Sequence, residues 1–276
     1  MFLILWRSKL RRMKDKYRHI WKGIKYKLFS QHRKGHGIHS PFVFEFVTKV
    51  LRNHEERPVY AEIDELRKYL QSSHETVSYR DPGAGSVSLP VKNRKIADII
   101  KTASISDKYG RLIYRMVEKY NPGIILEIGT SLGISTLYLA KANEKAKVYT
   151  LEGAEPVARV AKDNFTRMNS LNIQLKTGLF KDSLPEILSE LKMVDLVFFD
   201  GNHTKEATLD YFYQCLEKAG NQTIFIFDDI HWSVGMEDAW NIINTNKKIR
   251  ISIDLFRMGI VFFNKGFSKQ KFIIRY

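Results

Sequence analysis

The sequence predicts an α/β protein built on an open, mostly parallel β-sheet covered by helices. In residues 124–140, a short apolar run is broken at Gly129 and Gly133 and then continues with helical spacing. Short apolar runs go on alternating with helical patterns almost to the end of the chain, which is typical of a parallel sheet with helical crossovers. Acidic residues stand where several of these runs end, at the edge where open α/β sheets bind ligands.

The composition indicates a globular protein of 276 residues, with 44% hydrophobic and 27% charged residues. Its single cysteine, Cys215, excludes an intramolecular disulfide and a cysteine-based zinc site, and it fits a reducing compartment. The apolar residues 1–6 are too few to span a bilayer and precede the basic residues, which is the reverse of a signal peptide. We therefore expect a cytoplasmic protein.

Three parts are predicted along the chain: a basic arm over residues 1–34, a helical and loop cap over residues 35–103, and a ligand-binding domain over residues 104–276. The arm holds twelve Lys and Arg residues against one acid, so most of the net charge of +15 belongs to it. Its apolar residues recur at intervals of three and four, which predicts an amphipathic helix. Three roles remain open: packing on the domain or on a second subunit of a homodimer, contact with an anionic membrane surface, and contact with nucleic acid.

The cap is predicted to begin with a helix that has Ser40 as its N-cap and a proline at its first position. A second helix is expected over residues 53–71. Residues 81–86 are rich in turn formers and are expected to be a lid or an ordered loop. His36 and His39 are interpreted as loop residues, because two histidines alone do not make a metal site.

Strands and helices then alternate through the domain. Two of the expected helices begin after residues 110 and 133, and three more cover residues 156–168, 204–218 and 233–244. The expected strands are residues 124–128, 148–152, 173–177, 195–200, 223–229, 249–256 and 259–263. The last two alternate around Arg257 and Met258 and are predicted to form a closing hairpin, which makes seven strands in all.

The strand, glycine turn and helix of residues 124–140 place backbone N–H groups and a helix N-terminus at the ligand edge. Gly129 allows a sharp turn and a close approach of the ligand, and Gly133 lets the helix pack tightly on the strand. The spacing is E-x-G-x-x-x-G, not the G-x-G-x-x-G of dinucleotide sites, so a nicotinamide dehydrogenase is disfavoured. Glu127 can accept a hydrogen bond from an ammonium group, and Glu152 stands where a ribose-binding carboxylate belongs.

Glu127, the glycine turn and Glu152 together resemble the class I S-adenosylmethionine-dependent methyltransferase family. The loop and helix before the first strand are similar to its catechol O-methyltransferase branch. The resemblance implies a seven-stranded Rossmann-like sheet with an antiparallel last strand, S-adenosyl-L-methionine as cofactor, and a contact between Glu152 and the ribose. The cofactor-binding residues that it implies are Ser104, Ile105, Ser106, Glu127, Gly129, Thr130, Ser131, Gly133, Ser135, Glu152, Gly153, Phe180, Lys181 and Asp200.

Asp200, Asp228 and Asp229 end adjacent predicted strands, and neighbouring carboxylates repel one another unless a cation neutralises them. A divalent ion with oxygen ligands, Mg²⁺ first, fits that need, and the catechol-type branch implies that these three residues bind it. The sequence departs from that branch in two ways. Asp229 stands where that branch has an asparagine. No lysine follows Asp200 closely in the place of that branch's general base, so His203 becomes the nearest candidate base. Asp200 and His203 are the predicted catalytic residues, Trp232 is expected on the substrate side, and a metal-free variant stays open.

The sequence therefore predicts a methyltransferase that uses S-adenosylmethionine to methylate an oxygen of a small hydroxylated acceptor, with or without Mg²⁺. One alternative is methylation of RNA or protein docked through residues 1–34, which predicts strong salt dependence. Another is a non-catalytic protein that binds the cofactor without turnover.

Overall fold

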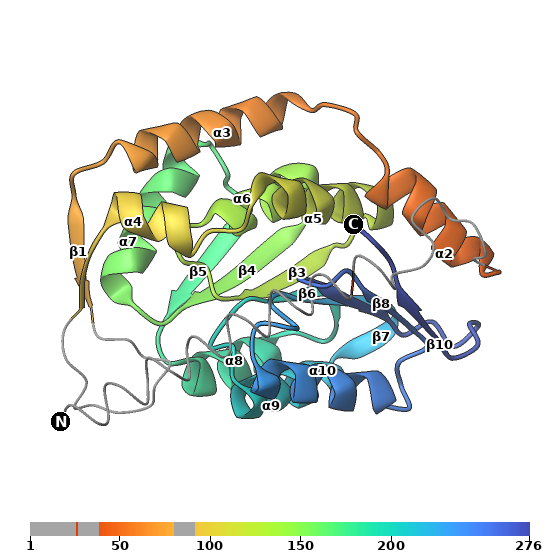
Figure 1. Cartoon of the computed structure of the whole chain (residues 1–276). Helices are drawn as coiled ribbons and strands as arrows, with labels where there is room; N and C mark the ends of the chain where they lie inside the picture. The colour runs from red at the N-terminus through yellow and green to blue at the C-terminus, as the bar shows by residue number, and fades with distance from the viewer. Residues whose placement is uncertain (1–25, 27–38, 80–91) are drawn as a thin grey trace, which may run out of the picture.

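The computed structural model describes residue 26, residues 39–79 and residues 92–276 (Figure 1). The basic arm, apart from Tyr26, lies outside the described residues. So do His36 and the turn-rich segment 81–86. None of the described helices combines the length and the apolar character that crossing a bilayer requires.

In the described part of the chain, eight strands form the central sheet, in the order β10-β8-β9-β7-β6-β3-β4-β5. Their bounds are β3 (Ile124–Ile128), β4 (Lys147–Glu152), β5 (Ile173–Thr177), β6 (Val194–Phe199), β7 (Ala219–Phe227), β8 (Ile251–Asp254), β9 (Gly259–Phe262) and β10 (Gln270–Ile273). The five strands from β7 to β5 are parallel, and β9 is antiparallel to both of its neighbours. The predicted open parallel sheet with an antiparallel seventh strand is confirmed.

The predicted number of seven strands is wrong, because β10 adds an edge strand parallel to β8. The side chains of β10 alternate between half-buried and exposed, and among the described strands only β8 pairs with it. An edge strand of this kind lacks the buried pattern by which the other strands were recognised.

Helices cover both faces of the sheet (Figure 1). On one face lie α5 (Asp107–Tyr120), α6 (Ile134–Ala142) and α7 (Glu155–Arg167), and on the other lie α8 (Phe180–Glu190), α9 (Lys205–Leu216) and α10 (Val234–Thr245). Successive strand residues point to opposite faces. Ile125 accordingly belongs to the hydrophobic cluster of the first face and Leu126 to that of the second. Burial on both faces explains why these strands read as continuous apolar runs.

The cap comprises α2 (Pro41–Glu45), the π-helical turn η1 (Phe46–Leu51), α3 (Pro58–Gln71), the antiparallel pair β1 (Thr76–Tyr79) and β2 (Lys92–Lys95), and α4 (Ile96–Thr102). The predicted N-cap is confirmed, because the Ser40 hydroxyl accepts a hydrogen bond from the Val43 amide at 3.4 Å. The helix predicted over residues 53–71 begins later, at Pro58, whose fixed φ suits a first helical position. The β1–β2 pair and α4 were not predicted.

The described cap residues share one hydrophobic core with the first face of the sheet. Buried Arg115 on α5 donates to the Val50 carbonyl at 2.7 Å and to the Tyr276 hydroxyl at 3.0 Å, which ties the cap to the C-terminal segment. Arg67 on α3 forms an ion pair with Asp107 at 2.8 Å. The boundaries between arm, cap and domain remain predictions.

The register of the sheet aligns the carboxyl ends of its central strands. Ile128 pairs with Phe199, and Phe199 pairs with Phe227. The Asp200 amide then donates to the Ile128 carbonyl, and the Asp228 amide donates to the Phe199 carbonyl, both at 2.9 Å. The residues that follow these three strands therefore stand in one row along the ligand edge.

Candidate functional site

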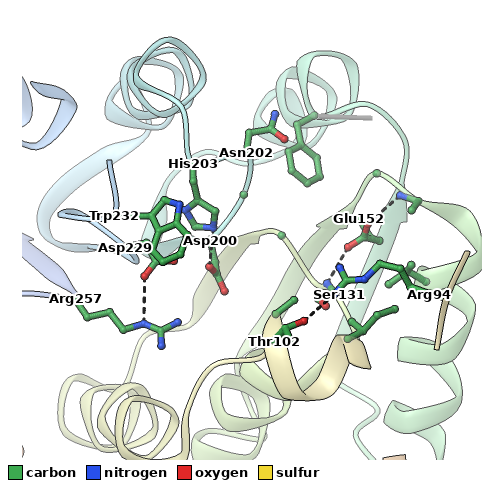
Figure 2. A pocket seen from close by; sticks show the side chains of 18 residues that line it. Arg94, Thr102, Ser131, Glu152, Asp200, Asn202, His203, Asp229, Trp232 and Arg257 are labelled. Atoms are coloured by element: carbon green, nitrogen blue, oxygen red, sulfur yellow. Dashed lines mark hydrogen bonds and ion pairs between the residues drawn. The ribbon is translucent and has the colours of Figure 1, made fainter. Parts of the chain in front are cut away.

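A cavity of about 480 Å³ opens at the carboxyl ends of β3, β4, β6 and β7, and its volume lies within the range of small-ligand sites. Figure 2 shows its labelled side chains in two groups. We call the group around Glu152, the residue expected to bind a ribose, the nucleoside half; it contains Arg94, Thr102, Ser131 and Glu152. We call the group around the predicted catalytic residues the acceptor half; it contains Asp200, Asn202, His203, Asp229, Trp232 and Arg257.

The glycine turn forms the floor between the two halves. The amides of Gly129 and Thr130 both donate to the Leu151 carbonyl at 3.0 Å. A Cβ atom on Gly129, whose φ is +107°, would lie 2.3 Å from the Asp200 carbonyl oxygen. The position therefore requires glycine both for its backbone conformation and for the close contact between two loops.

Glu152 is held at the end of β4 by two backbone amides. Its Oε2 accepts from the Ser131 amide at 2.8 Å, and its Oε1 accepts from the Ala154 amide at 2.9 Å. A carboxylate oxygen can accept more than one hydrogen bond, and the Glu152 side chain lines the cavity. This placement suits the predicted contact with a ribose diol, which stays a prediction.

Glu127 lies beneath the turn, is fully buried, and does not line the cavity. The hydroxyls of Thr136 and Thr150 donate to its Oε2, and its Oε1 has no hydrogen-bond partner among the described residues. Burial raises the pKa of this carboxyl to about 7, although the surrounding hydroxyls oppose the rise. Glu127 thus ties the end of β3 to β4 and to the start of α6, and its predicted contact with an ammonium group remains a prediction.

Changing Glu127 to glutamine is expected to stabilise the protein relative to wild type at alkaline pH. A buried acid with a raised pKa costs no stability below its unfolded value of 4.5 and opposes folding as pH rises through about 7. The unfolding free energy of the variant minus that of wild type should increase by about 2 kcal/mol between pH 5 and pH 8. Urea unfolding of both proteins at pH 5 and pH 8 measures this increase. The same variant-minus-wild-type difference at both pH values would contradict the raised pKa of Glu127.

Six of the predicted cofactor-binding residues line the cavity: Gly129, Ser131, Glu152, Gly153, Phe180 and Asp200. Half-buried Phe180 starts α8 beside Gly201, where an added Cβ would lie 2.7 Å from its ring. Other predicted residues do not reach the lining: Thr130, Gly133 and Ser135 are buried and Lys181 is exposed.

The predicted cofactor-binding segment of residues 104–106 also lies outside the lining. Arg67 donates to the Ser104 hydroxyl at 3.2 Å and to the Ile105 carbonyl, which draws the segment toward α3. Thr102 and Ala103, just before it, line the cavity instead.

The cap also contributes residues that were not predicted. Arg94 on β2 donates to the Thr102 hydroxyl on α4 at 2.7 Å, and both side chains line the nucleoside half. No local motif marks them, because a single arginine in a polar stretch has the pattern of an ordinary surface residue. Only the packing of the β1–β2 pair beside α7 brings Arg94 to the cavity.

The loop after β6 holds Asp200 and His203 together. Asn202 and His203 have φ values of 61° and 33°, a left-handed conformation that non-glycine residues rarely adopt and that often marks a functional site. The next residue, Thr204, caps α9 by accepting from the Ala207 amide at 3.3 Å. The chain reversal places His203 Nε2 3.4 Å from Asp200 Oδ1.

The pKa values of Asp200 and His203 both differ from their ordinary values. Burial chiefly raises the pKa of Asp200 to about 6, and the charge of Asp228 adds to the rise while His203 opposes it. For His203, burial lowers the pKa, but Asp200 and the charges of Asp229 and Asp228 together raise it to about 9. Near pH 7 the imidazole therefore carries the proton and the carboxylate the negative charge.

The three aspartates do not fit the predicted Mg²⁺ site. Asp228 is 1% exposed, and both of its oxygens accept from Arg257: Nε at 3.1 and 3.3 Å and Nη2 at 2.8 Å. Asp229 Oδ1 lies 3.4 Å from the same Nε, and Asp200 is paired with His203. In the part of the chain that the structure describes, no three His, Cys, Asp or Glu side chains are grouped so that they could hold a metal ion. Cationic side chains already satisfy the carboxylates that a metal would need.

Arg257 occupies the tip of the predicted β8–β9 hairpin. Phe256 adopts φ of 72°, and the Arg257 carbonyl accepts from the Ile230 amide at 3.0 Å, which docks the tip on the loop after β7. The sequence pattern marked this arginine only as part of a turn. Trp232, 61% exposed, lies in the same loop after β7 and presents its ring at the rim of the acceptor half (Figure 2).

Comparisons with known proteins agree with this architecture. Residues 126–230 match a family model described as a methyltransferase domain. The chain is 29% identical over 130 residues to a catechol O-methyltransferase of Niastella koreensis, and 28% identical over 129 residues to one of Mycobacterium tuberculosis. Each match covers 46% of this chain, and the chain spans 58% and 57% of the lengths of these relatives.

Solved structures show the same fold. An O-methyltransferase from Bacillus cereus in complex with SAH aligns with a TM-score of 0.55 at 22% identity, covering 80% of this chain and 97% of that one. The O-methyltransferase TomG from Streptomyces achromogenes in complex with SAM aligns with a TM-score of 0.53 at 16% identity, covering 80% and 95%.

The domain match is to a methyltransferase, and the fold is the one that the resemblance to the class I S-adenosylmethionine-dependent methyltransferases implied. Within that class, the similarity is to the catechol O-methyltransferase-like branch.

Proposed function

We propose that this chain is an S-adenosylmethionine-dependent O-methyltransferase that acts on a small hydroxylated acceptor. The observation that carries the proposal is one cavity at the strand ends whose two halves suit the two reactants. Glu152 is set to receive the ribose hydroxyls, and Phe180 offers an aromatic face or edge for the adenine. Asp200 and His203 stand on the opposite side, where the acceptor would enter.

When bound, the cofactor's sulfonium supplies an activated methyl group for direct displacement. The chain contributes alignment of the two reactants across the Gly129 turn and removal of the acceptor's hydroxyl proton. In its neutral form, held by Asp200 through Nε2, the His203 imidazole would take that proton on Nδ1. In and beneath the acceptor half, the three carboxylates of Asp200, Asp228 and Asp229 lie against the two cations of Arg257 and His203, and this excess of negative charge favours binding of a sulfonium.

The acceptor half favours a compact, planar acceptor. Trp232 can stack on a flat ring at the rim while a hydroxyl on that ring reaches Asp200 and His203. The cap, which contributes Arg94 and Thr102 to the lining, would cover the cofactor. Homodimer formation, and contact of residues 1–34 with nucleic acid or a membrane, remain predictions.

Calorimetric titration of the full chain with S-adenosylmethionine tests the first half of this proposal, with NAD as the comparison ligand. S-adenosylmethionine is expected to bind and NAD is not, because the turn lacks the third glycine of a dinucleotide site. A screen of phenols and other hydroxylated acceptors, followed by release of S-adenosylhomocysteine, tests the second half. Binding without turnover on any acceptor would favour the non-catalytic alternative, and loss of turnover on removing residues 1–34 or raising salt would favour a macromolecular acceptor.

A further inference from the structure

We propose that Arg257 supplies, from within the chain, the positive charge that the predicted Mg²⁺ would have supplied, and that the acceptor site works without a divalent ion. The second part rests on the proposed function, whereas the first concerns only the side chains of the site.

The first step is that Arg257 neutralises the carboxylate of Asp228. This carboxylate is almost fully buried, so leaving it without a cationic partner would be strongly unfavourable. Arg257 meets it with two nitrogens and also lies 3.4 Å from Asp229. A planar guanidinium matches carboxylate geometry, and it stays charged at every accessible pH. Burial by itself lowers the pKa of Arg257, but these carboxylates raise it above its ordinary value.

The second step is that a metal ion would have to displace the side chain of Arg257, whose backbone is fixed at the hairpin tip. Its carbonyl is bonded to the Ile230 amide, and its guanidinium lies 5.7 Å from the ring centre of Tyr109. The Tyr109 hydroxyl in turn donates to the Leu255 carbonyl, two residues before the arginine, at 3.3 Å. A divalent ion entering this place would have to break the arginine's bonds to Asp228 and would meet its positive charge at close range.

The third step is that the arginine faces the cavity as well as the acids. Figure 2 shows its guanidinium directed into the acceptor half, next to Asp229. Among the described residues, Nη1 makes no hydrogen bond, since the bonds to the aspartates involve Nε and Nη2. Nη1 is therefore placed to hold an oxygen of the acceptor, the orienting role that a bound metal would otherwise have.

Manganese binding tests this inference without cofactor or acceptor, because Mn²⁺ is a paramagnetic substitute for Mg²⁺ whose free form is counted by electron paramagnetic resonance. Wild-type protein is expected to show no Mn²⁺ site that depends on Asp228. Removing the guanidinium with Arg257→Met should unmask the carboxylates and give a site at least ten times tighter than any in wild type. Adding Asp228→Asn to that variant should abolish the new site.

Arg111→Met is the matched control, because Arg111 also joins two acids, Glu56 and Asp64, but outside the cavity. It should gain no comparable site. If Arg257→Met does not fold, as judged by circular dichroism, Arg257→Gln takes its place. A folded variant that gains no Mn²⁺ site would overturn the inference, as would a wild-type site that Asp228→Asn weakens.

The same samples separate this inference from the proposed function. Titration with S-adenosylmethionine reports on the nucleoside half and does not depend on the outcome with Mn²⁺. Once an acceptor is found, EDTA should leave wild-type turnover unchanged, and a loss of turnover that Mg²⁺ restores would contradict the metal-free site. Arg257→Lys, which keeps the charge but not the planar fork, should raise KM for the acceptor more than it lowers kcat.

Discussion

Replacing His203 with alanine is expected to lower kcat for methyl transfer by about 10²- to 10⁴-fold, the usual contribution of a positioned general base. The affinity for S-adenosylmethionine should stay within about threefold of wild type, because His203 lies in the acceptor half of the cavity. Turnover is measured as release of S-adenosylhomocysteine and affinity by calorimetry. The role as a base would be disproved by a variant that retains more than a tenth of wild-type kcat.

His231→Ala provides a control, since His231 is also paired with an aspartate, Asp254, at 2.8 Å, but does not line the cavity. Its kcat should remain within about threefold of wild type. A similar loss in both variants would indicate that any change in these loops damages the site, and that His203 has no special role.

The pH profile gives an independent measure of the same role. Since the pKa of His203 is raised to about 9, the imidazole must lose its proton before it can accept one from the acceptor. Wild-type kcat/KM should therefore rise with pH from 7 and level off toward about 9. A bound sulfonium lowers this pKa and moves the bend to lower pH without changing the sign. His203→Asn should remove the bend, and a wild-type profile that falls over this range would contradict the assignment.

Replacing Glu152 with alanine is expected to weaken binding of S-adenosylmethionine by about 100-fold or more. Two hydrogen bonds from ribose hydroxyls to a carboxylate contribute roughly 3 kcal/mol or more together, which corresponds to about that factor. The substitution also removes the acceptor for the Ser131 and Ala154 amides, so the glycine turn and the start of α7 each lose one restraint. Calorimetry with both the cofactor and S-adenosylhomocysteine should show the same loss, because the two share the ribose.

Glu155→Ala is the matched comparison for this variant. Glu155 is an exposed acid three residues away whose ion pair, with Arg159 at 3.3 Å, lies outside the cavity. Its removal should leave cofactor affinity within about twofold of wild type. If Glu152→Ala bound the cofactor as tightly as Glu155→Ala, the nucleoside half would have to be assigned to another part of the cavity.

The strand and helix order of the domain could be predicted because each signal is local. Continuous apolar runs mark strands buried on both faces, and Ser40 marks a helix start by a bond within its own turn. The edge strand β10 and the short pair β1 and β2 were missed, since neither forms a buried apolar run. Their pairing depends on partners elsewhere in the chain.

Among the features predicted for the site, the glycine turn together with Glu152, Asp200 and His203 do lie at the cavity, because the contacts that position them are within the turn, the next strand end or one loop. Only the tertiary structure decided what neutralises the aspartates. Arg257 lies 29 positions after Asp228 in the sequence. The pairing of β7 with β9 brings the hairpin tip that carries it to the strand ends. Charge pairing acts through space, so the sequence could show that three carboxylates needed a cation, but the fold determined that an arginine meets that need.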